Sequence, residues 1–198
     1  MKISFKFLNL IFSKKLVSAS LLICALFSFL IGSVLFYSLD IKESFLSFFI
    51  SDFISRSEQT FLKVFLSSLK ANSLFILPLF LSAMSFSGLV LPHLIFSYYS
   101  FSVSLAASFL YSTYKFSGIL YFFIVLLPDI FIFFLCLFLA SYITFEKSYL
   151  IIFSKRSIDF KHSLSSFVKN YLFVFLLTII SSLVSGGSSF FFANMFNF

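Results

Sequence analysis

The stretch "LLPDIFIFF" at residues 126–134 decides how the chain must be read, because it puts a proline and a carboxylate inside a very apolar run. That run extends over about 119–143, more than the roughly 20 residues that cross a hydrocarbon core as a helix. A central Asp costs about 2.5–3.5 kcal/mol there on insertion scales. Pro128 removes one backbone hydrogen bond and should bend the helix. We therefore expect a kinked membrane span in which Asp129 faces protein.

The composition supports the same reading for the whole chain. Of its 198 residues, 61% are hydrophobic and only 11% are charged, and the mean hydropathy is +1.11. A soluble domain of this length needs many more polar residues for its surface. The composition therefore predicts an all-α, polytopic transmembrane helical bundle that forms one integral membrane domain over residues 1–198.

Five spans are expected from the apolar runs: 16–37, 72–91, 94–112, 119–143 and 171–193. The first run is too long for the apolar region of a signal peptide and lacks a clear small-residue cleavage site, so we expect an uncleaved span. Cys24 and Cys136 both lie within spans. Small buried residues are a better interpretation of them than a disulfide or a metal pair.

Lys and Arg predict the orientation, because cytoplasmic loops of membrane proteins carry an excess of them. With a cytoplasmic N-terminus, the inner side holds Lys2, Lys6, Lys14, Lys15, Lys147, Lys155, Arg156, Lys161 and Lys169. The outer side holds Lys42, Arg56, Lys63, Lys70 and Lys115, nearly balanced by Asp40, Glu43, Asp52 and Glu58. We expect the N-terminus in the cytoplasm and the C-terminus outside. This bias explains the net charge of +7 without nucleic-acid binding.

Two segments between spans have a helical pattern of their own. In 40–70, polar residues recur every three to five positions, which predicts an amphipathic helix on the outer membrane surface. The alternative is that this segment simply extends the second span. The basic segment 145–170 is expected to be a cytoplasmic loop that suits the anionic inner leaflet.

Pro92 and His93 lie between the second and third spans, where they predict a tight cytoplasmic turn or a helix interruption. A proton-handling role for His93 is one interpretation, and a structural or solvated histidine is the favoured one. His162 lies among lysines and should be solvated. The sequence contains no metal-ligand spacing, and we expect no metal or other cofactor.

Small residues recur every four positions in three spans, a spacing that lets helix backbones approach closely. The three sets are Ser20, Cys24, Ser28 and Gly32; Ser100, Ser104, Ser108 and Ser112; and Ser181, Ser185, Ser189 and Ala193. These serine faces could supply hydrogen bonds to Asp129. Because no second charged residue lies deep in another expected span, a hydrogen-bonded Asp129 at the kink is favoured over a transport or proton-relay site.

The order of these features resembles the stage II sporulation protein M family of bacterial integral membrane proteins. The residues that carry the resemblance are 61–92, with Asn72 at the span entrance and Gly88 near its end before Pro92, and 117–145, with Gly118 and the central Pro128–Asp129. The chain departs from the family where relatives have glycines in the third span and Gln or His after the central proline.

The resemblance implies a non-enzymatic scaffold in the bacterial cell membrane that helps recruit cell-wall hydrolases during engulfment. Its partners would be the lipid bilayer and other membrane proteins, and homo-oligomers are left open. The sequence has no phosphate loop, nucleophile–base motif or metal constellation, so an enzyme is not expected. The alternative is a permease-like transporter subunit that works with a separate cytoplasmic ATPase.

Overall fold

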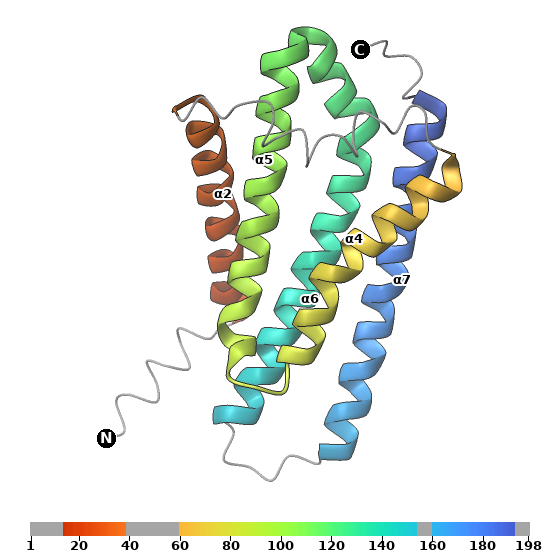
Figure 1. Ribbon diagram of the computed structural model, residues 1–198. Coiled ribbons are helices and arrows are strands. Elements are labelled where there is room, and N and C mark those ends of the chain that lie inside the picture. Colours follow the sequence, from red (N-terminus) through yellow and green to blue (C-terminus); the bar gives the residue numbers. More distant parts are fainter. Residues whose placement is uncertain (1–13, 39–59, 154–159, 193–198) are drawn as a thin grey trace.

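The computed structural model describes residues 14–38, 60–153 and 160–192, and every element in them is helical (Figure 1). The elements are α2 (Lys14–Ser38), α4 (Phe61–Ser82), α5 (Ser87–Tyr121), the π-helix η2 (Phe122–Leu126), α6 (Leu127–Phe153) and α7 (Phe160–Phe192). The expected all-α fold is confirmed.

Four segments of the described residues are long and apolar enough to cross a membrane. They are Leu16–Ser38, Phe61–Ser82, Ser87–Ile152 and Ser165–Phe192. Their large apolar side chains remain widely exposed on the outside of the bundle, as at Leu26 and Phe27, which are 66% and 63% exposed. Such a surface suits lipid rather than water, so the chain has the character of a multi-pass membrane protein.

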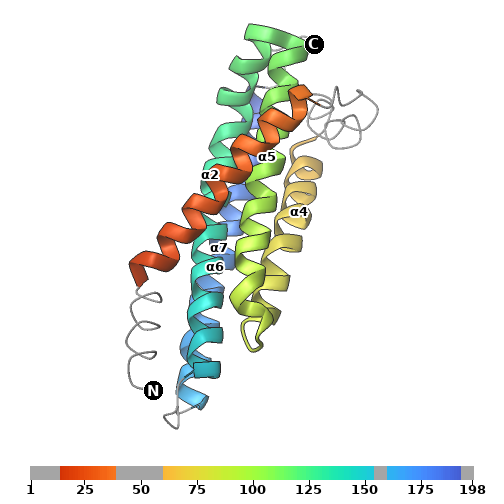
Figure 2. The ribbon, with the colours of Figure 1, turned by 90° about the vertical axis from the view of Figure 1, so that its left-hand side faces the viewer.

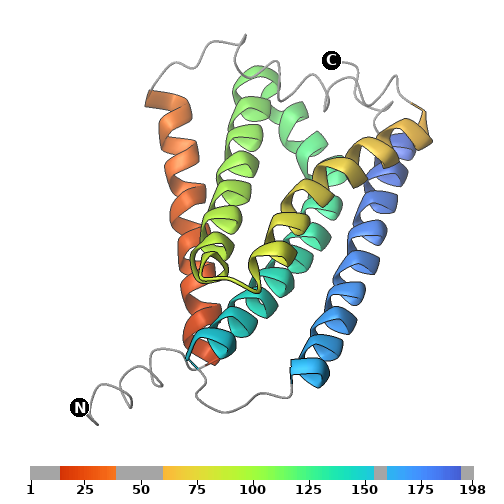
Figure 3. The same cartoon turned by 60° about the horizontal axis from the view of Figure 1, so that its bottom comes forward.

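The third of these segments reverses direction at Lys115. This residue has φ 50° and ψ −121°. Among the residues that the structure describes, it is the one non-glycine residue with a positive φ. The chain rises along α5 to this point and returns through η2 and α6, as Figures 1 and 3 show. A positive φ breaks the helical backbone path, which lets a segment of 66 residues fold into two antiparallel arms.

Each helix of the bundle packs against defined neighbours. The rising arm of α5 lies between α2 and α6, and α7 contacts both α4 and α6. Figure 2 shows α2 lying obliquely across the outside of α5 and α6. α2 and the rising arm of α5 run in the same direction, whereas α4 and α6 run opposite to α7 (Figure 1).

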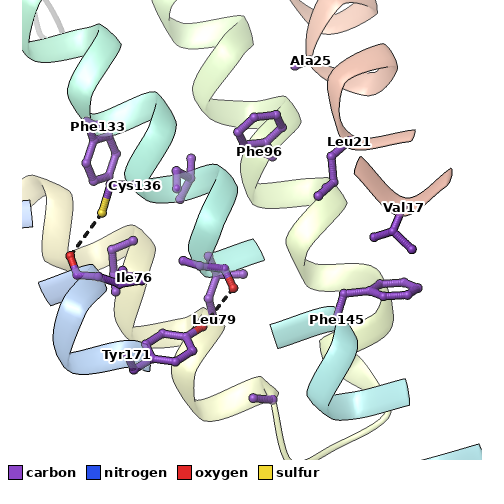
Figure 4. Packing of buried hydrophobic residues seen from close by; sticks show 14 of the residues in the cluster. Val17, Leu21, Ala25, Ile76, Leu79, Phe96, Phe133, Cys136, Phe145 and Tyr171 are labelled. Atoms are coloured by element: carbon purple, nitrogen blue, oxygen red, sulfur yellow. Dashed lines mark hydrogen bonds between the residues drawn. The ribbon is translucent and has the colours of Figure 1, made fainter. Parts of the chain in front are cut away.

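One apolar core is shared by the helices α2, α4, α5, α6 and α7. It includes Leu21 of α2, Ile76 of α4, Phe96 of α5, Phe133 of α6 and Val174 of α7. Figure 4 shows several of these side chains converging from different helices. A smaller cluster of Leu110, Tyr121, Val125 and Leu126 fills the region below the reversal at Lys115.

The predicted boundary between the second and third spans was wrong. α4 ends at Ser82 and α5 begins at Ser87, so Pro92 and His93 lie inside α5 and not in a turn. The chain reverses earlier, at a compact turn that is stabilised by hydrogen bonds between serine residues. The Ser85 amide and hydroxyl both donate to the Ser82 carbonyl, each at 2.9 Å. Pro92 is the sixth residue of α5, so it lies beyond the first turn and removes one backbone hydrogen bond from the helix interior.

The two predicted intervening segments also need correction. Residues 61–70 are the first part of α4 and bury Val64 and Ser68 against the bundle, so the alternative that this part extends the second span holds. Residues 40–59 lie outside the described residues. The expected loop 145–170 is largely helical, because α6 continues to Phe153 and α7 begins at Phe160.

Candidate functional site

Asp129 lies where α6 meets α7, in the first turn of α6. The Ser181 hydroxyl donates a hydrogen bond of 2.5 Å to Asp129 Oδ1 and lies 3.4 Å from the Asp129 carbonyl oxygen. Ser181 is fully buried, and Asp129 is half-buried. A serine bond of this kind reduces the cost of holding a carboxyl group within an apolar helix bundle.

Asn72 joins α4 to the same place. Its Nδ2 atom lies 3.5 Å from Ser68 Oγ, 3.5 Å from Ser181 Oγ and 3.4 Å from Ser182 Oγ. We call Ser68, Asn72, Asp129, Ser181 and Ser182 the polar seam. It connects α4, α6 and α7, with Ser181 as the shared hydroxyl between the amide and the carboxyl group.

The helix next to Asp129 is irregular. In η2, just before Pro128, the backbone hydrogen bonds lengthen to the π pattern, and the Leu127 N–H bonds the Phe122 carbonyl. Proline supplies no N–H, so carbonyls of the preceding turn lose their usual partner. Ser188 of α7 donates to the Val125 carbonyl at 2.8 Å. Single π turns are frequent at functional positions.

The other predicted site residues do not join the polar seam. Gly88 and Pro92 are buried at the end of the bundle that holds the α4–α5 turn. Gly118 is buried at the opposite end, next to the reversal at Lys115. Of the six residues singled out in the sequence, the structure brings Asn72 and Asp129 together through Ser181, and Pro128 directly precedes Asp129 in the chain. A role for these residues beyond packing stays a prediction.

A second polar cluster, at the end of α4, was not predicted from the sequence. Thr144 donates to the Leu79 carbonyl at 3.1 Å, and Ser148 donates to the Ala83 carbonyl at 2.9 Å. Tyr171 bonds both Thr144 and, at 3.2 Å, the Ala140 carbonyl. The last carbonyls of a helix lack intrahelical partners, and α6 supplies them here. The four-residue spacing of Thr144 and Ser148 was the available indication.

His93 packs between neighbouring helices. Its Nε2 atom lies 3.0 Å from Ser20 Oγ of α2, and its ring stacks edge-on against Phe145 of α6, with centroids 5.8 Å apart. The histidine therefore links three helices. This arrangement agrees with the interpretation of His93 as a structural residue.

Two of the small-residue stripes meet between α2 and α5. Ser104 donates to the Phe29 carbonyl at 2.6 Å, and a Cβ added to Gly32 would lie 2.9 Å from Ser104 Cβ. Ser112 instead bonds the Phe109 carbonyl of its own helix. Cys136 is buried and lies 3.1 Å from Thr178 Oγ1, and Cys24 is partly buried; both are free thiols.

The chemistry available at the polar seam is that of hydroxyl, amide and carboxyl oxygens. Across the described residues, no three His, Cys, Asp or Glu side chains gather as they would around a transition metal. Groups of this kind can hydrogen-bond neighbouring helices to one another or hold a proton. Comparisons of the chain with protein-family models, curated proteins and solved structures found no match.

Proposed function

We propose that this chain is a non-enzymatic scaffold in the bacterial cell membrane that assembles other membrane or cell-wall proteins. The observation that carries the proposal is the hydrogen bond between Ser181 and Asp129. It commits the deep carboxyl group to a neighbouring helix, and Asn72 adds a third helix through the same hydroxyl. Polar groups used in this way fix one arrangement of helices, which is what a scaffold needs.

The proposed topology has five passes. In it the segment Ser87–Ile152 crosses twice, because its two arms are antiparallel and 66 residues far exceed one membrane thickness. The N-terminus is cytoplasmic and the C-terminus is outside. The orientation follows from the greater number of basic residues expected on the cytoplasmic side. It places the α4–α5 turn inside and Lys115 outside.

The proposed partners follow from the resemblance to the stage II sporulation protein M family. They are cell-wall hydrolases, recruited during engulfment in an organism that forms spores. Lipid would cover the large exposed apolar side chains of the helices, and further copies of the chain are additional partners to test. The part proposed for this chain is to position the hydrolases, which carry out the chemistry.

A capture experiment tests the proposal. The tagged chain is purified from sporulating cells after cross-linking, and peptidoglycan hydrolases are quantified in the eluate. Enrichment over an unrelated multi-pass protein expressed at the same level is expected. Asp129→Leu, which removes the Ser181 bond, should reduce the enrichment, whereas Gly187→Ala should not, because open space surrounds that position. No hydrolase enrichment with the unaltered chain would overturn the proposal.

A second function is favoured by one observation, the π-helix η2 beside Pro128 and Asp129. A local break in a span next to a carboxyl group is also found along transport pathways. In this alternative the chain is a permease-like subunit that works with a separate cytoplasmic ATPase. Co-purification of an ATPase whose hydrolysis rate rises on binding the chain would favour transport over scaffolding.

A further inference from the structure

Two lysines lie on the side of α4 that faces away from the rest of the bundle. Lys63 and Lys70 are exposed, whereas Val64, Ser68 and Asn72 of the same helix are buried. In the part of the chain that the structure describes, neither ammonium group has a hydrogen-bond or ion-pair partner. Figure 1 shows α4 at the surface of the helix bundle. Both positive charges are therefore open to whatever surrounds the protein.

Lys70 lies well inside a segment that can cross the membrane. α4 has 22 residues and is a candidate membrane span, and Lys70 is its tenth residue. At 1.5 Å per residue the helix is about 33 Å long, close to the roughly 30 Å thickness of a hydrocarbon core. A lysine that faces lipid at this depth is costly, and charged residues in spans pair with one another to avoid that cost. The position of Lys70 therefore favours a negatively charged partner beside α4.

The spacing of the two lysines favours a helix over lipid headgroups as that partner. Lys70 follows Lys63 by seven residues, which is about 10 Å along the helix axis. Lys63 is the third residue of α4, and a lysine near a helix end can reach the membrane surface with its ammonium group. Headgroup phosphates all lie at that surface. A neighbouring helix can instead present carboxylates at both depths.

The surface between and beside the lysines permits another helix to approach closely. Ser67 and Ala71 are exposed on the same side of α4, four residues apart. Small residues at this spacing let helix backbones pack together in a membrane. The outside of α2 differs, because it exposes large apolar side chains such as Leu26 and Phe27, which suit lipid. The name lysine stripe is used below for Lys63, Ser67, Lys70 and Ala71.

A second copy of this chain is a poor source of the negative charge. In a symmetric contact between two α4 helices, lysines would face lysines, and like charges repel. The acidic residues among those that the structure describes are Asp129 and Glu146, and both already take part in interactions. The described helices of a second copy therefore offer no free carboxylate to the lysine stripe.

We propose that the lysine stripe is a docking surface for a transmembrane helix of another protein, which carries two Asp or Glu residues about two turns apart. Its carboxylates neutralise Lys63 and Lys70 within the membrane, and the small side chains of Ser67 and Ala71 let the helix approach. This inference concerns the membrane-facing surface of α4 and does not rest on the recruitment of hydrolases.

Photo-crosslinking of the full chain in its native membrane tests the proposal. Leu74 is replaced by the photo-reactive residue benzoylphenylalanine, because it is 65% exposed and follows Lys70 by four residues. After irradiation, mass spectrometry identifies the adduct. The expected adduct joins α4 to a transmembrane helix of another protein that has two acidic residues about seven positions apart. The same replacement at Leu26 of α2 is the control and should not capture that helix.

Charge variants show what holds the adduct together. Lys63→Met combined with Lys70→Met removes both charges and should lower the yield of the adduct at least about tenfold. Lys63→Arg combined with Lys70→Arg should keep the yield. Because neither ammonium group bonds to the bundle, the Met pair should unfold at the same temperature as the unaltered chain or at a higher one. A structural role for the lysines would instead lower that temperature.

A defined probe provides a second measurement. The purified chain in lipid nanodiscs is mixed with a fluorescent Leu- and Ala-rich transmembrane peptide that has two Glu residues seven positions apart. Energy transfer should show tighter binding of this peptide than of its counterpart with two Gln residues. The Met pair of variants should bind both peptides alike.

Equal binding of the Glu and Gln peptides to the unaltered chain would overturn the proposal. So would an undiminished adduct in the Met pair, or an adduct formed only with lipid, with this chain itself or with a helix that lacks acidic residues. An acidic helix from a protein other than a hydrolase would support the docking surface and count against hydrolase recruitment. The docking surface and the scaffold function can therefore fail separately.

Discussion

Gly118 faces the backbone of Leu110 so closely that a Cβ on the glycine would lie 2.0 Å from the Leu110 carbonyl oxygen. The two residues stand on opposite sides of the reversal at Lys115. Because the obstacle is backbone and not the end of a flexible side chain, the hairpin between the two arms needs a residue without a side chain here.

Gly118→Ala should therefore destabilise the folded chain by about 1–3 kcal/mol or more, the usual cost of overpacking where neighbours cannot relax. The measurement is unfolding in mixed micelles titrated with a denaturing detergent. Gly187→Ala is the matched control, because nothing lies within 4 Å of its added Cβ. Equal stability of the two variants would contradict the close packing of the hairpin.

Gly88→Ala should be similarly damaging at the other end of the bundle. A Cβ there would lie 1.9 Å from Ser148 Oγ and 2.5 Å from the Ser82 carbonyl oxygen. Ser148→Ala should fail to rescue Gly88→Ala, since the Ser82 backbone still blocks the methyl group. Full rescue in the double variant, measured by the same unfolding assay, would show that the α4–α5 turn is more adaptable than its geometry indicates.

Asp129→Asn and Asp129→Leu should separate a hydrogen-bonding role from a charged one. Asn can still accept the Ser181 hydroxyl hydrogen bond, so scaffold function should persist, whereas Leu leaves Ser181 without that acceptor and should reduce scaffold function. Hydrolase capture in each variant, normalised to membrane expression, provides the measurement. Loss with both substitutions would favour the transport alternative, in which the carboxyl group must titrate.

Tyr171→Phe should cost about 0.6–1.5 kcal/mol of stability, because it removes a hydroxyl that bonds Thr144 and the Ala140 carbonyl. Thr144 would retain its bond to the Leu79 carbonyl, which limits the loss. Tyr37→Phe is the control, since that ring is 59% exposed. Indistinguishable unfolding curves for the two variants would remove Tyr171 from the interhelical contacts that stabilise the bundle.

The proposed five-pass topology predicts opposite accessibility for the two exposed turn residues Ser85 and Lys115. In a Cys24→Ser background, Lys115→Cys should react with a membrane-impermeant maleimide in intact cells. Ser85→Cys should react only after the membrane is opened. The buried Cys136 thiol should remain unlabelled in both. Labelling of both positions from the same side would exclude a double crossing by Ser87–Ile152.

The polar seam shows where prediction from sequence stops. The spacing of Ser181, Ser185 and Ser189 indicated one face of α7, and Asp129 was expected to need a hydrogen-bond donor. Nothing in the sequence paired Asp129 with Ser181, because any of the three serine stripes could have supplied that donor. Ser182 lies off the stripe, and its position beside Asn72 depends on how α4 and α7 cross.

The sequence by itself determined that this chain is a bundle of apolar helices, because long runs without charge can satisfy their backbone in lipid only by helix formation. It also indicated which small residues permit close packing, as at Gly32 and Ser104. Tertiary structure alone decided where helices end and which polar groups meet. The α4–α5 turn forms at Ser82–Ser87, and the second arm begins after Lys115, because turns between apolar helices depend on local hydrogen bonds and on backbone contacts such as Gly118 with Leu110. Those contacts join residues through space, and hydropathy along the chain does not record them.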